Sequence, residues 1–480
     1  MNNLMVRIPD KYWALLALSI WGVLCLLVAN KTLYGIDEGA ARALLLVWSV
    51  VDNVVSPVIT SGLPDFRTVF LVPAGFLWTG NVLAAKVTTI IVMALAVWAI
   101  HSWRLRSGNS ESSLLASGLL LISPPIIGQI DTISVAPYLL FTFAIGAWAE
   151  KLYREAPLAF GGKYFGQMFL CMVSATLHPA GLAYPLALMW SWHKDPIGKQ
   201  QYYFFGGIVF SVLFALLLTL GWHDLAWFTN PIRSLSSLLS ESQAGNDIGT
   251  FRWITGLGIS CLLLWVSWKQ ARDLCADFLG RILLAALVIG ILVGDETWAI
   301  IALTICLYWG FPLLLRTRAK SFDGFWGQRG IALSLIFVIS TSFMLMDKAR
   351  FQKISAGYLG PRDSLIKAMV ENIESISSDK PSQDKPAKKP LVIASQWPGL
   401  TMLACKCGAF PLPPPAKDEQ ALLAMLHGVD YLIFDPRNPA NSSLSQNLAI
   451  MNAGKAETLT LQEGGVIIEI KEFAPAKAAK

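Results

Sequence analysis

Long apolar stretches recur along this sequence and constrain its fold more than any other feature. A helix needs about 20 predominantly apolar residues to cross the hydrocarbon core of a bilayer. Since 54% of the residues are hydrophobic and only 15% are charged, the composition lies outside the range of soluble globular proteins. The sequence therefore predicts a polytopic α-helical membrane protein. The apolar runs that approach the required length are residues 12–30, 86–103, 112–128, 133–150, 203–221, 253–268, 298–315 and 331–346.

Two further segments add to these runs. Residues 165–192 are too long for one helix and are interrupted by His178-Pro179, which predicts a hairpin of two short helices meeting at this dipeptide. Residues 279–293 form another short apolar segment, so we expect about eleven transmembrane helices in all. The first run lacks a convincing small-residue cleavage site, and we expect it to remain as a signal anchor.

The basic residues predict the orientation of these spans. Cytoplasmic loops of membrane proteins are enriched in Lys and Arg. Alternate connections carry such residues, at 104–106, 151–163, 194–199, 269–281 and 316–329, whereas those around 131, 178 and 295–296 carry none. We therefore expect a multi-pass protein of the bacterial inner membrane with a cytoplasmic N-terminus. The predicted outer segments are residues 31–85, 129–132, 222–252 and everything after about 347. Because the basic residues follow this pattern, the net charge of +6 does not indicate a nucleic-acid partner.

The first outer loop, residues 31–85, opens with the adjacent carboxylates Asp37 and Glu38. Charge so close to hydrocarbon is costly unless it has a partner or a function. We expect two amphipathic helices in the outer interface, at about 39–55 and 66–80. Residues 43–60 are apolar enough to be a further crossing, an alternative that leaves the downstream orientation unchanged.

The composition changes after residue 346, which ends the predicted transmembrane domain, 1–346. Residues 347–390 form a linker region whose second part, 372–390, is polar and rich in Pro. Residues 391–480 alternate between strands at 391–394, 431–434 and 465–470 and a helix at 418–427, which indicates a small periplasmic α/β domain. It contains no Gly-rich phosphate loop or nucleophile elbow, so we expect a binding, gating or structural role. Its close pair Cys405 and Cys407 is a poor metal site without further ligands.

In this topology several ionisable residues fall at the outer ends of helices. Each also has a structural interpretation: Asp131 could cap the helix that follows it, and His178 could be a satisfied structural residue beside Pro179. Arg67 and Lys86 could extend toward the interface or bind phosphate. The full set is Asp37, Glu38, Asp131, His178, His223, Asp224, Asp295 and Glu296.

The arrangement resembles the GT-C glycosyltransferases of the protein mannosyltransferase and lipid A aminoarabinose transferase type. The resemblance rests on Asp37-Glu38 after the first helix, on the stretch from Leu77 to Lys86 that opens the second, on Asp131 before a later helix, and on His178-Pro-Ala-Gly-Leu. It implies a polyprenyl-phosphate-linked sugar as the donor substrate. The Lys-Pro-Pro-Leu-like stretch of many members is missing, as is the aromatic residue usual after Asp-Glu. Residues 63–67 stand roughly where the former would be.

The resemblance also implies roles for the candidate residues. Asp37 would be the base that deprotonates the acceptor hydroxyl, with Glu38 or Asp131 orienting the acceptor or holding a divalent cation. Arg67, Lys86 or His178 would face the donor phosphate. Direct displacement at the anomeric carbon would invert its configuration, and the acceptor would be a glycan, a lipid or a protein.

Two other functions remain open at this point. In a secondary transporter or lipid flippase the carboxylates would bind protons or substrate, but such proteins usually carry ionisable groups near the bilayer midplane and show internal repeats. Here the charges lie at helix ends, and no repeat is evident. A non-catalytic envelope-assembly protein would use its C-terminal domain to bind a partner.

Overall fold

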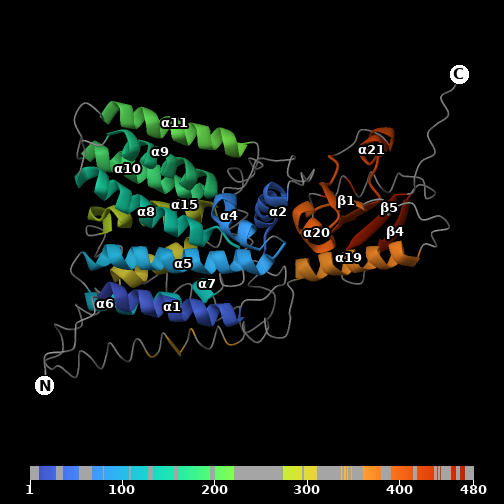
Figure 1. Ribbon diagram of the computed structural model, residues 1–480. Helices are drawn as coiled ribbons and strands as arrows, with labels where there is room; N and C mark the ends of the chain where they lie inside the picture. The colour runs from blue at the N-terminus through green and yellow to red at the C-terminus, as the bar shows by residue number, and fades with distance from the viewer. Residues whose placement is uncertain are drawn as a thin grey trace. The chain divides into compact units, whose positions relative to one another are not determined.

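The computed structural model describes most of the predicted helices and the C-terminal domain (Figure 1). The described residues are 10–28, 36–52, 67–78, 80–106, 110–127, 133–155, 160–194, 201–220, 274–293, 297–310, 361–379, 391–414, 419–436, 456–460 and 465–470, with a few isolated positions. The predicted spans at 253–268 and 331–346 lie largely or wholly outside them.

The chain divides into two compact units. One, the helical unit, comprises residues 1–30 and 86–356, and the other, the α/β unit, comprises residues 31–85 and 357–480. The sequence analysis grouped the first outer loop with the transmembrane domain. In the structure this loop packs instead with the C-terminal residues, through contacts that are described below.

The helical unit is a bundle whose helices lie side by side with roughly parallel axes (Figure 1). The predicted hairpin at His178 is confirmed, because α9 ends at Leu177, a short 3-10 helix η1 follows, and α10 begins at Ala183. A π-helical turn, η4, continues α16. The elements are α1 (Asp10–Val28), α5 (Val82–Leu105), α6 (Ser110–Leu121), α7 (Pro124–Ile127), α8 (Ala136–Glu155), α9 (Phe160–Leu177), η1 (Pro179–Leu182), α10 (Ala183–Lys194), α11 (Gln201–Leu220), α15 (Phe278–Val293), α16 (Thr297–Ile305) and η4 (Cys306–Gly310).

The bundle buries aromatic side chains and exposes apolar ones. Tyr138 and Tyr308 are fully buried. The hydroxyl of Tyr138 is hydrogen-bonded to Thr89 and that of Tyr308 to Ser117, each at 2.7 Å, so both buried hydroxyls are paired. On the outside, Phe210 of α11 is 70% exposed. Apolar surface of this kind is expected where a helix faces lipid.

Within the described residues, α5 is the one helix whose length and apolar composition suffice to cross a bilayer. Its 24 residues span about 36 Å at 1.5 Å per residue, against about 30 Å of hydrocarbon. The total of about eleven spans remains a prediction. Shorter apolar helices occupy Tyr12–Leu26, Arg67–Leu77, Tyr164–Leu177, Phe205–Phe214, Phe278–Val293 and Thr297–Gly310.

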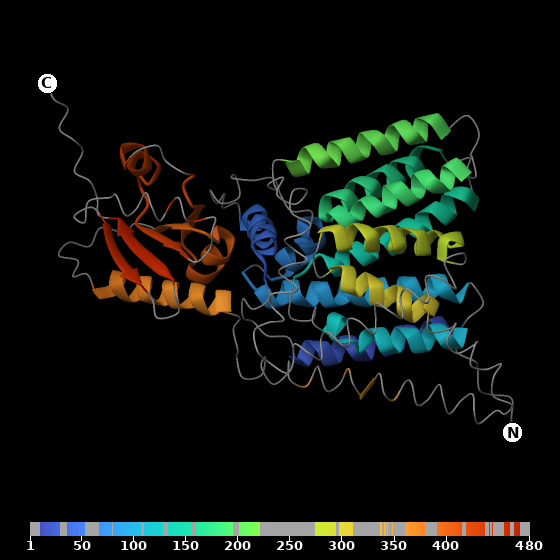
Figure 2. The ribbon, with the colours of Figure 1, turned by 180° about the vertical axis from the view of Figure 1, so that it is seen from behind.

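The α/β unit contains a five-stranded mixed sheet in the order β2-β1-β3-β5-β4. The parallel strand β1 (Val392–Ser395) lies between β2 (Gly408–Pro411) and β3 (Tyr431–Phe434), and β5 (Val466–Ile470) is antiparallel to both β3 and β4 (Ala456–Thr460). Alternate side chains of the strands point to opposite faces, so the sheet needs cover on both. Figure 2 shows these strands side by side, with the helix α19 (Pro361–Asp379) along one face.

Both faces of the sheet are covered. Leu365, Met369 and Ile373 of α19 pack against one face, in a cluster with Ile393 and Ile433. The opposite face carries Ala394 and Leu432, which pack against Leu422 of α21 (Glu419–Met425). The strands expected at 391–394, 431–434 and 465–470 and the helix at 418–427 are confirmed within one or two residues.

The linker prediction is wrong for residues 361–379. They belong to α19, since the apolar side chains at 365, 369 and 373 follow the helical i, i+4 spacing and pack on the sheet. Three elements were not predicted at all: β2, β4 and the helix α20 (Pro398–Cys405).

The described residues of the first outer loop contain the helices α2 (Glu38–Asp52) and α4 (Arg67–Leu77), as expected at 39–55 and 66–80. They pack closely, since a Cβ on Gly75 would lie 1.9 Å from Cγ1 of Val47. The 15 residues of α2 span about 22 Å, which is short of the hydrocarbon thickness. The alternative crossing at 43–60 includes residues 53–60, which lie outside the described residues.

Candidate functional site

Asp37 precedes the first residue of α2, and its carboxylate accepts two hydrogen bonds. Its Oδ1 accepts the backbone N–H of Ala40 at 2.6 Å, as an N-cap carboxylate does. Its Oδ2 accepts a bond from Nη1 of Arg67 at 2.8 Å. The Asp37 side chain is 50% exposed, whereas that of Arg67 is 5% exposed. The site thus presents a fixed carboxylate to solvent with a buried guanidinium behind it.

Arg67 is the first residue of α4, so this ion pair joins the starts of the two loop helices. A buried guanidinium is costly unless it is paired and hydrogen-bonded. The contact with Asp37 provides that partner. In the structure Arg67 pairs with the candidate base, and its expected role at the donor phosphate stays a prediction.

Glu38 contacts a helix that lies 360 residues further along the chain. Its Oε1 accepts the N–H of Gly399 at 2.7 Å, and its Oε2 accepts the N–H of Leu400 at 3.2 Å. These groups are at the start of α20, whose N-cap residue, Trp397, makes no side-chain capping bond. The carboxylate therefore occupies the anion position at the N-terminus of a helix.

A side chain at position 399 would crowd the close approach of Glu38 to α20. A Cβ on Gly399 would lie 2.9 Å from Oε1 of Glu38 and 3.1 Å from Cβ of Ala41. Arg42 donates a further bond to Oε1 of Glu38 at 3.0 Å. Burial raises the pKa of Glu38 above its ordinary value, although the bonds from Gly399, Arg42 and Leu400 act in the opposite direction.

The other candidates belong to the helical unit or are not described. His178 caps η1, with its Nδ1 accepting the N–H of Ala180 at 3.1 Å, and is 5% exposed. Lys86 lies in α5 and is fully buried. Asp131 lies outside the described residues. The structure thus brings together Asp37, Glu38 and Arg67, all in the α/β unit. His223, Asp224, Asp295 and Glu296 also lie outside the described residues.

The described residues do not form a site for a divalent cation. The oxygens of Asp37 and Glu38 accept bonds from two arginines and three backbone N–H groups. In the described part of the chain no group of three His, Cys, Asp or Glu side chains is placed to hold a metal. We therefore derive no step through a metal ion.

Sequence reasoning missed the partners of Glu38 and the state of the two close cysteines. Pro398 at the first position of α20 is typical of a helix start and could have revealed that helix. Cys405 and Cys407, considered only as a poor metal site, form a disulfide at the end of α20. Lys406 between them adopts a left-handed conformation, with φ of 53°, and caps the helix through its N–H.

Comparison with known proteins identifies the fold. No protein-family model and no curated protein matches the sequence, but 16 chains of solved structures match the structure. The Archaeoglobus fulgidus oligosaccharyltransferase tethered to an acceptor peptide aligns over 96% of this chain and 74% of its own, at 12% identity and a TM-score of 0.52. ArnT of Cupriavidus metallidurans bound to undecaprenyl phosphate aligns over 95% of this chain and 98% of its own, at 12% identity and a TM-score of 0.51.

ArnT in its apo state gives a similar result, with a TM-score of 0.50 at 12% identity, over 95% of this chain and 97% of its own. The alignments cover at least 95% of this chain, so the likeness includes residues of both the helical unit and the α/β unit. The chain has the fold of the GT-C glycosyltransferases. At these identities the likeness establishes the fold, and the activity has to be argued from the site.

Proposed function

We propose that the protein is an integral membrane glycosyltransferase that moves a sugar from a polyprenyl-phosphate donor to an acceptor on the periplasmic side. The observation that carries this proposal is the half-exposed carboxylate of Asp37, fixed by Arg67 and by the N–H of Ala40. The GT-C fold supports it, as does the undecaprenyl phosphate bound to ArnT, a protein of the same fold.

Asp37 acts as the general base in this proposal. It takes the proton of the acceptor hydroxyl as the acceptor oxygen forms a bond to the anomeric carbon. The bond from that carbon to the phosphate oxygen breaks, and polyprenyl phosphate leaves with the electron pair. Because attack and departure occur on opposite faces, the anomeric configuration inverts. The apolar surface of the helical unit provides the environment for the polyprenyl chain.

Arg67 acts through Asp37 as a positioning residue. A carboxylate that must accept a proton at a defined place benefits from a fixed orientation, since small displacements of a catalytic group cost large factors in rate. We retain Lys86 and His178 as proposed phosphate-binding residues of the helical unit, and Asp131 as a residue that orients the acceptor.

Glu38 has a second positioning role. Its bonds to Gly399 and Leu400 connect α2, which begins beside the base, to α20 of the C-terminal domain. This connection gives that domain a function that needs no catalytic motif of its own. Removing residues 391–480 would therefore weaken or abolish transfer, even in a protein that still inserts into the membrane.

Two observations support the proposed placement of the α/β unit in the periplasm. The distribution of Lys and Arg puts the segments of this unit outside. The Cys405–Cys407 disulfide fits an oxidising compartment.

The proposal is tested with the purified full-length protein and a panel of polyprenyl-phosphate-linked sugars. Release of polyprenyl phosphate, together with labelled glycan, lipid or peptide acceptor, is the expected result. Movement of the lipid-linked sugar across a vesicle membrane without transfer would favour the flippase alternative instead.

A further inference from the structure

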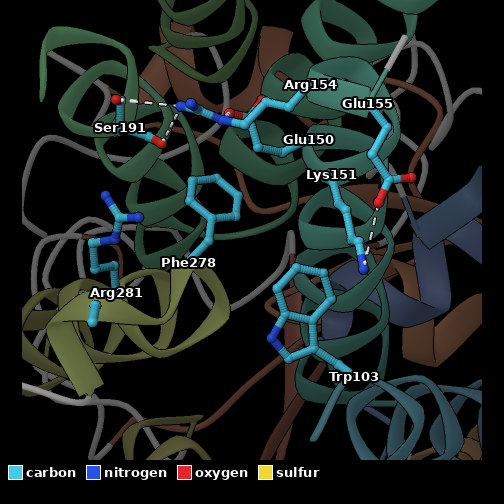
Figure 3. A pocket seen from close by; sticks show the side chains of 9 residues that line it. Trp103, Glu150, Lys151, Arg154, Glu155, Ser191, Phe278 and Arg281 are labelled. Carbon is cyan, nitrogen blue, oxygen red and sulfur yellow. Dashed lines mark hydrogen bonds and ion pairs between the residues drawn. The ribbon is translucent and has the colours of Figure 1, made fainter. Parts of the chain in front are cut away.

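A pocket of about 400 Å³ lies in the helical unit, where α5 and α8 end and α15 begins (Figure 3). All its lining residues belong to this unit, so it is separate from the site around Asp37. Its volume is within the range of about 300–1,000 Å³ that small-molecule sites occupy. The lining residues are Trp103, Glu150, Lys151, Arg154, Glu155, Ser191, Ala276, Phe278 and Arg281.

The ionisable side chains of the pocket carry an excess of positive charge. Among the described lining residues, the cations are Lys151, Arg154 and Arg281 and the anions are the carboxylates of Glu150 and Glu155. Arg154 Nε lies 2.7 Å from Glu150 Oε1, and Lys151 Nζ lies 3.5 Å from Glu155 Oε1. Three cations against two anions leave one positive charge, which favours an anionic ligand.

The pocket holds its guanidinium groups in defined positions. Nη2 of Arg154 donates to Oγ of Ser191 at 2.7 Å, a contact drawn in Figure 3. Glu150, which pairs with Arg154, is 2% exposed and is itself fixed by Nε1 of Trp192 at 2.8 Å. Arg281 lies 5.5 Å from the centre of the Phe278 ring. Cations that are ordered before binding lose little side-chain freedom when an anion arrives.

The surroundings indicate the headgroup level of a membrane. Arg106 lies 3.9 Å from the centre of the Trp148 ring. Trp at the end of a bundle, together with Lys and Arg, is typical of a membrane interface. Leu152, next to Lys151, is 54% exposed, and Trp190, next to Ser191, is 65% exposed. Such apolar surface beside the pocket suits acyl chains.

We propose that this pocket binds the phosphate group of an anionic glycerophospholipid, with Arg154, Arg281 and Lys151 as its ligands. Basic pockets between transmembrane helices on the cytoplasmic side are suited to phospholipid headgroups. The assignment to the cytoplasmic leaflet rests on the proposed topology. The binding of a phosphate group is argued from the side chains of the pocket and does not depend on that topology. A free phosphate compound would present the same group, so the experiment has to distinguish the two sources.

Native mass spectrometry of the full-length protein in detergent, titrated with phosphatidylglycerol, tests the site. We expect saturable binding of one lipid, and an affinity lower by about tenfold or more in Arg281→Gln, because a charge-assisted bond to phosphate is lost. Lys151→Gln provides a second variant, should Arg281→Gln fail to fold. Arg106→Gln is the matched control, since it removes a cation from the same end of the bundle without lining the pocket.

Parallel titrations with phosphatidylcholine and inorganic phosphate identify the source of the ligand. Weaker binding of phosphatidylcholine and no competition by phosphate support an anionic lipid. If inorganic phosphate competes with the lipid, and if this competition is lost in Arg281→Gln, the lipid proposal is wrong and the pocket binds a soluble phosphate compound instead. Equal losses in Arg281→Gln, Lys151→Gln and Arg106→Gln, or no saturable binding, would overturn the site itself.

Discussion

Nη1 of Arg67 lies 2.8 Å from Oδ2 of Asp37, and this contact joins the first residue of α4 to the N-cap of α2. The two residues differ in exposure, at 5% for the Arg67 side chain and 50% for that of Asp37. The buried partner is therefore the support, and the exposed carboxylate is the group that can meet an acceptor. This relationship, rather than the number of acidic residues in the loop, is the basis of the proposed site.

Arg67→Gln should lower kcat by about tenfold or more while changing KM for the donor little, because the base loses its orientation and the donor contacts remain. Arg67→Lys should restore part of the rate, since an ammonium keeps the charge without the planar geometry of the guanidinium. Steady-state transfer kinetics of both variants provide the measurement. An unchanged kcat in Arg67→Gln would contradict the positioning role.

Glu38→Ala should lower the free energy of unfolding of the α/β unit by about 1–2 kcal/mol, because α20 loses the carboxylate at its N-terminus. Transfer should fall as well, since α2 loses its connection to α20. Chemical denaturation of the purified protein measures the first effect. Glu371→Ala is the matched control: Glu371 forms an exposed pair with Lys367 at 3.7 Å, and its loss should cost less than about 0.5 kcal/mol.

The raised pKa of Glu38 predicts a pH dependence of stability. The native state holds the proton more tightly than the unfolded state, whose Glu titrates near 4.5. The proton-linked part of the contribution of Glu38 to stability is therefore fully present below pH 4.5 and is lost as the pH rises through the higher pKa of the folded state, whereas the bonds from Gly399 and Leu400 remain. The free energy of unfolding of the wild type minus that of Glu38→Gln should therefore decrease as the pH rises through this range. A difference that grows with pH would show that the pKa is lowered instead.

The predicted topology is tested by labelling single introduced cysteines in intact cells. Positions near Arg106, Lys199, Arg272 and Arg318 should react only after permeabilisation, because basic loops stay in the cytoplasm. Positions after Met346 should react without it. A C-terminal segment that reacts only in permeabilised cells would contradict a periplasmic site.

The sequence predicted those parts of the fold that depend on local pattern. Apolar runs located the described helices of the bundle, and His178-Pro179 located the break between α9 and α10, because Pro cannot continue a helix from the preceding turn. The short strands β1, β3 and β5 were recognisable from their β-branched, apolar residues.

The parts that escaped prediction depend on contacts between distant residues. The polar composition of α19 hid its apolar stripe, which is evident only once the sheet is there to cover it. The assignment of the first loop to the α/β unit rests on Glu38 meeting Gly399, a pairing that no local pattern contains. For the same reason the contact between Arg67 and Asp37 was not predicted, whereas a role of Arg67 at the donor phosphate stays a prediction.

The most direct test of the proposed activity is the transfer rate of Asp37→Asn. Asn can still accept the N–H of Ala40 and cap α2, but its Nδ2 cannot accept the bond that Arg67 donates to Oδ2 of Asp37, and it cannot take a proton from an acceptor hydroxyl. Asp52→Asn, at the other end of the same helix, serves as the control and should retain transfer. We predict a loss of about two to four orders of magnitude in Asp37→Asn, with expression, folding and donor binding unchanged. Transfer by Asp37→Asn at the rate of the wild type would contradict the assignment of Asp37 as the base and remove the site from the proposed glycosyltransferase.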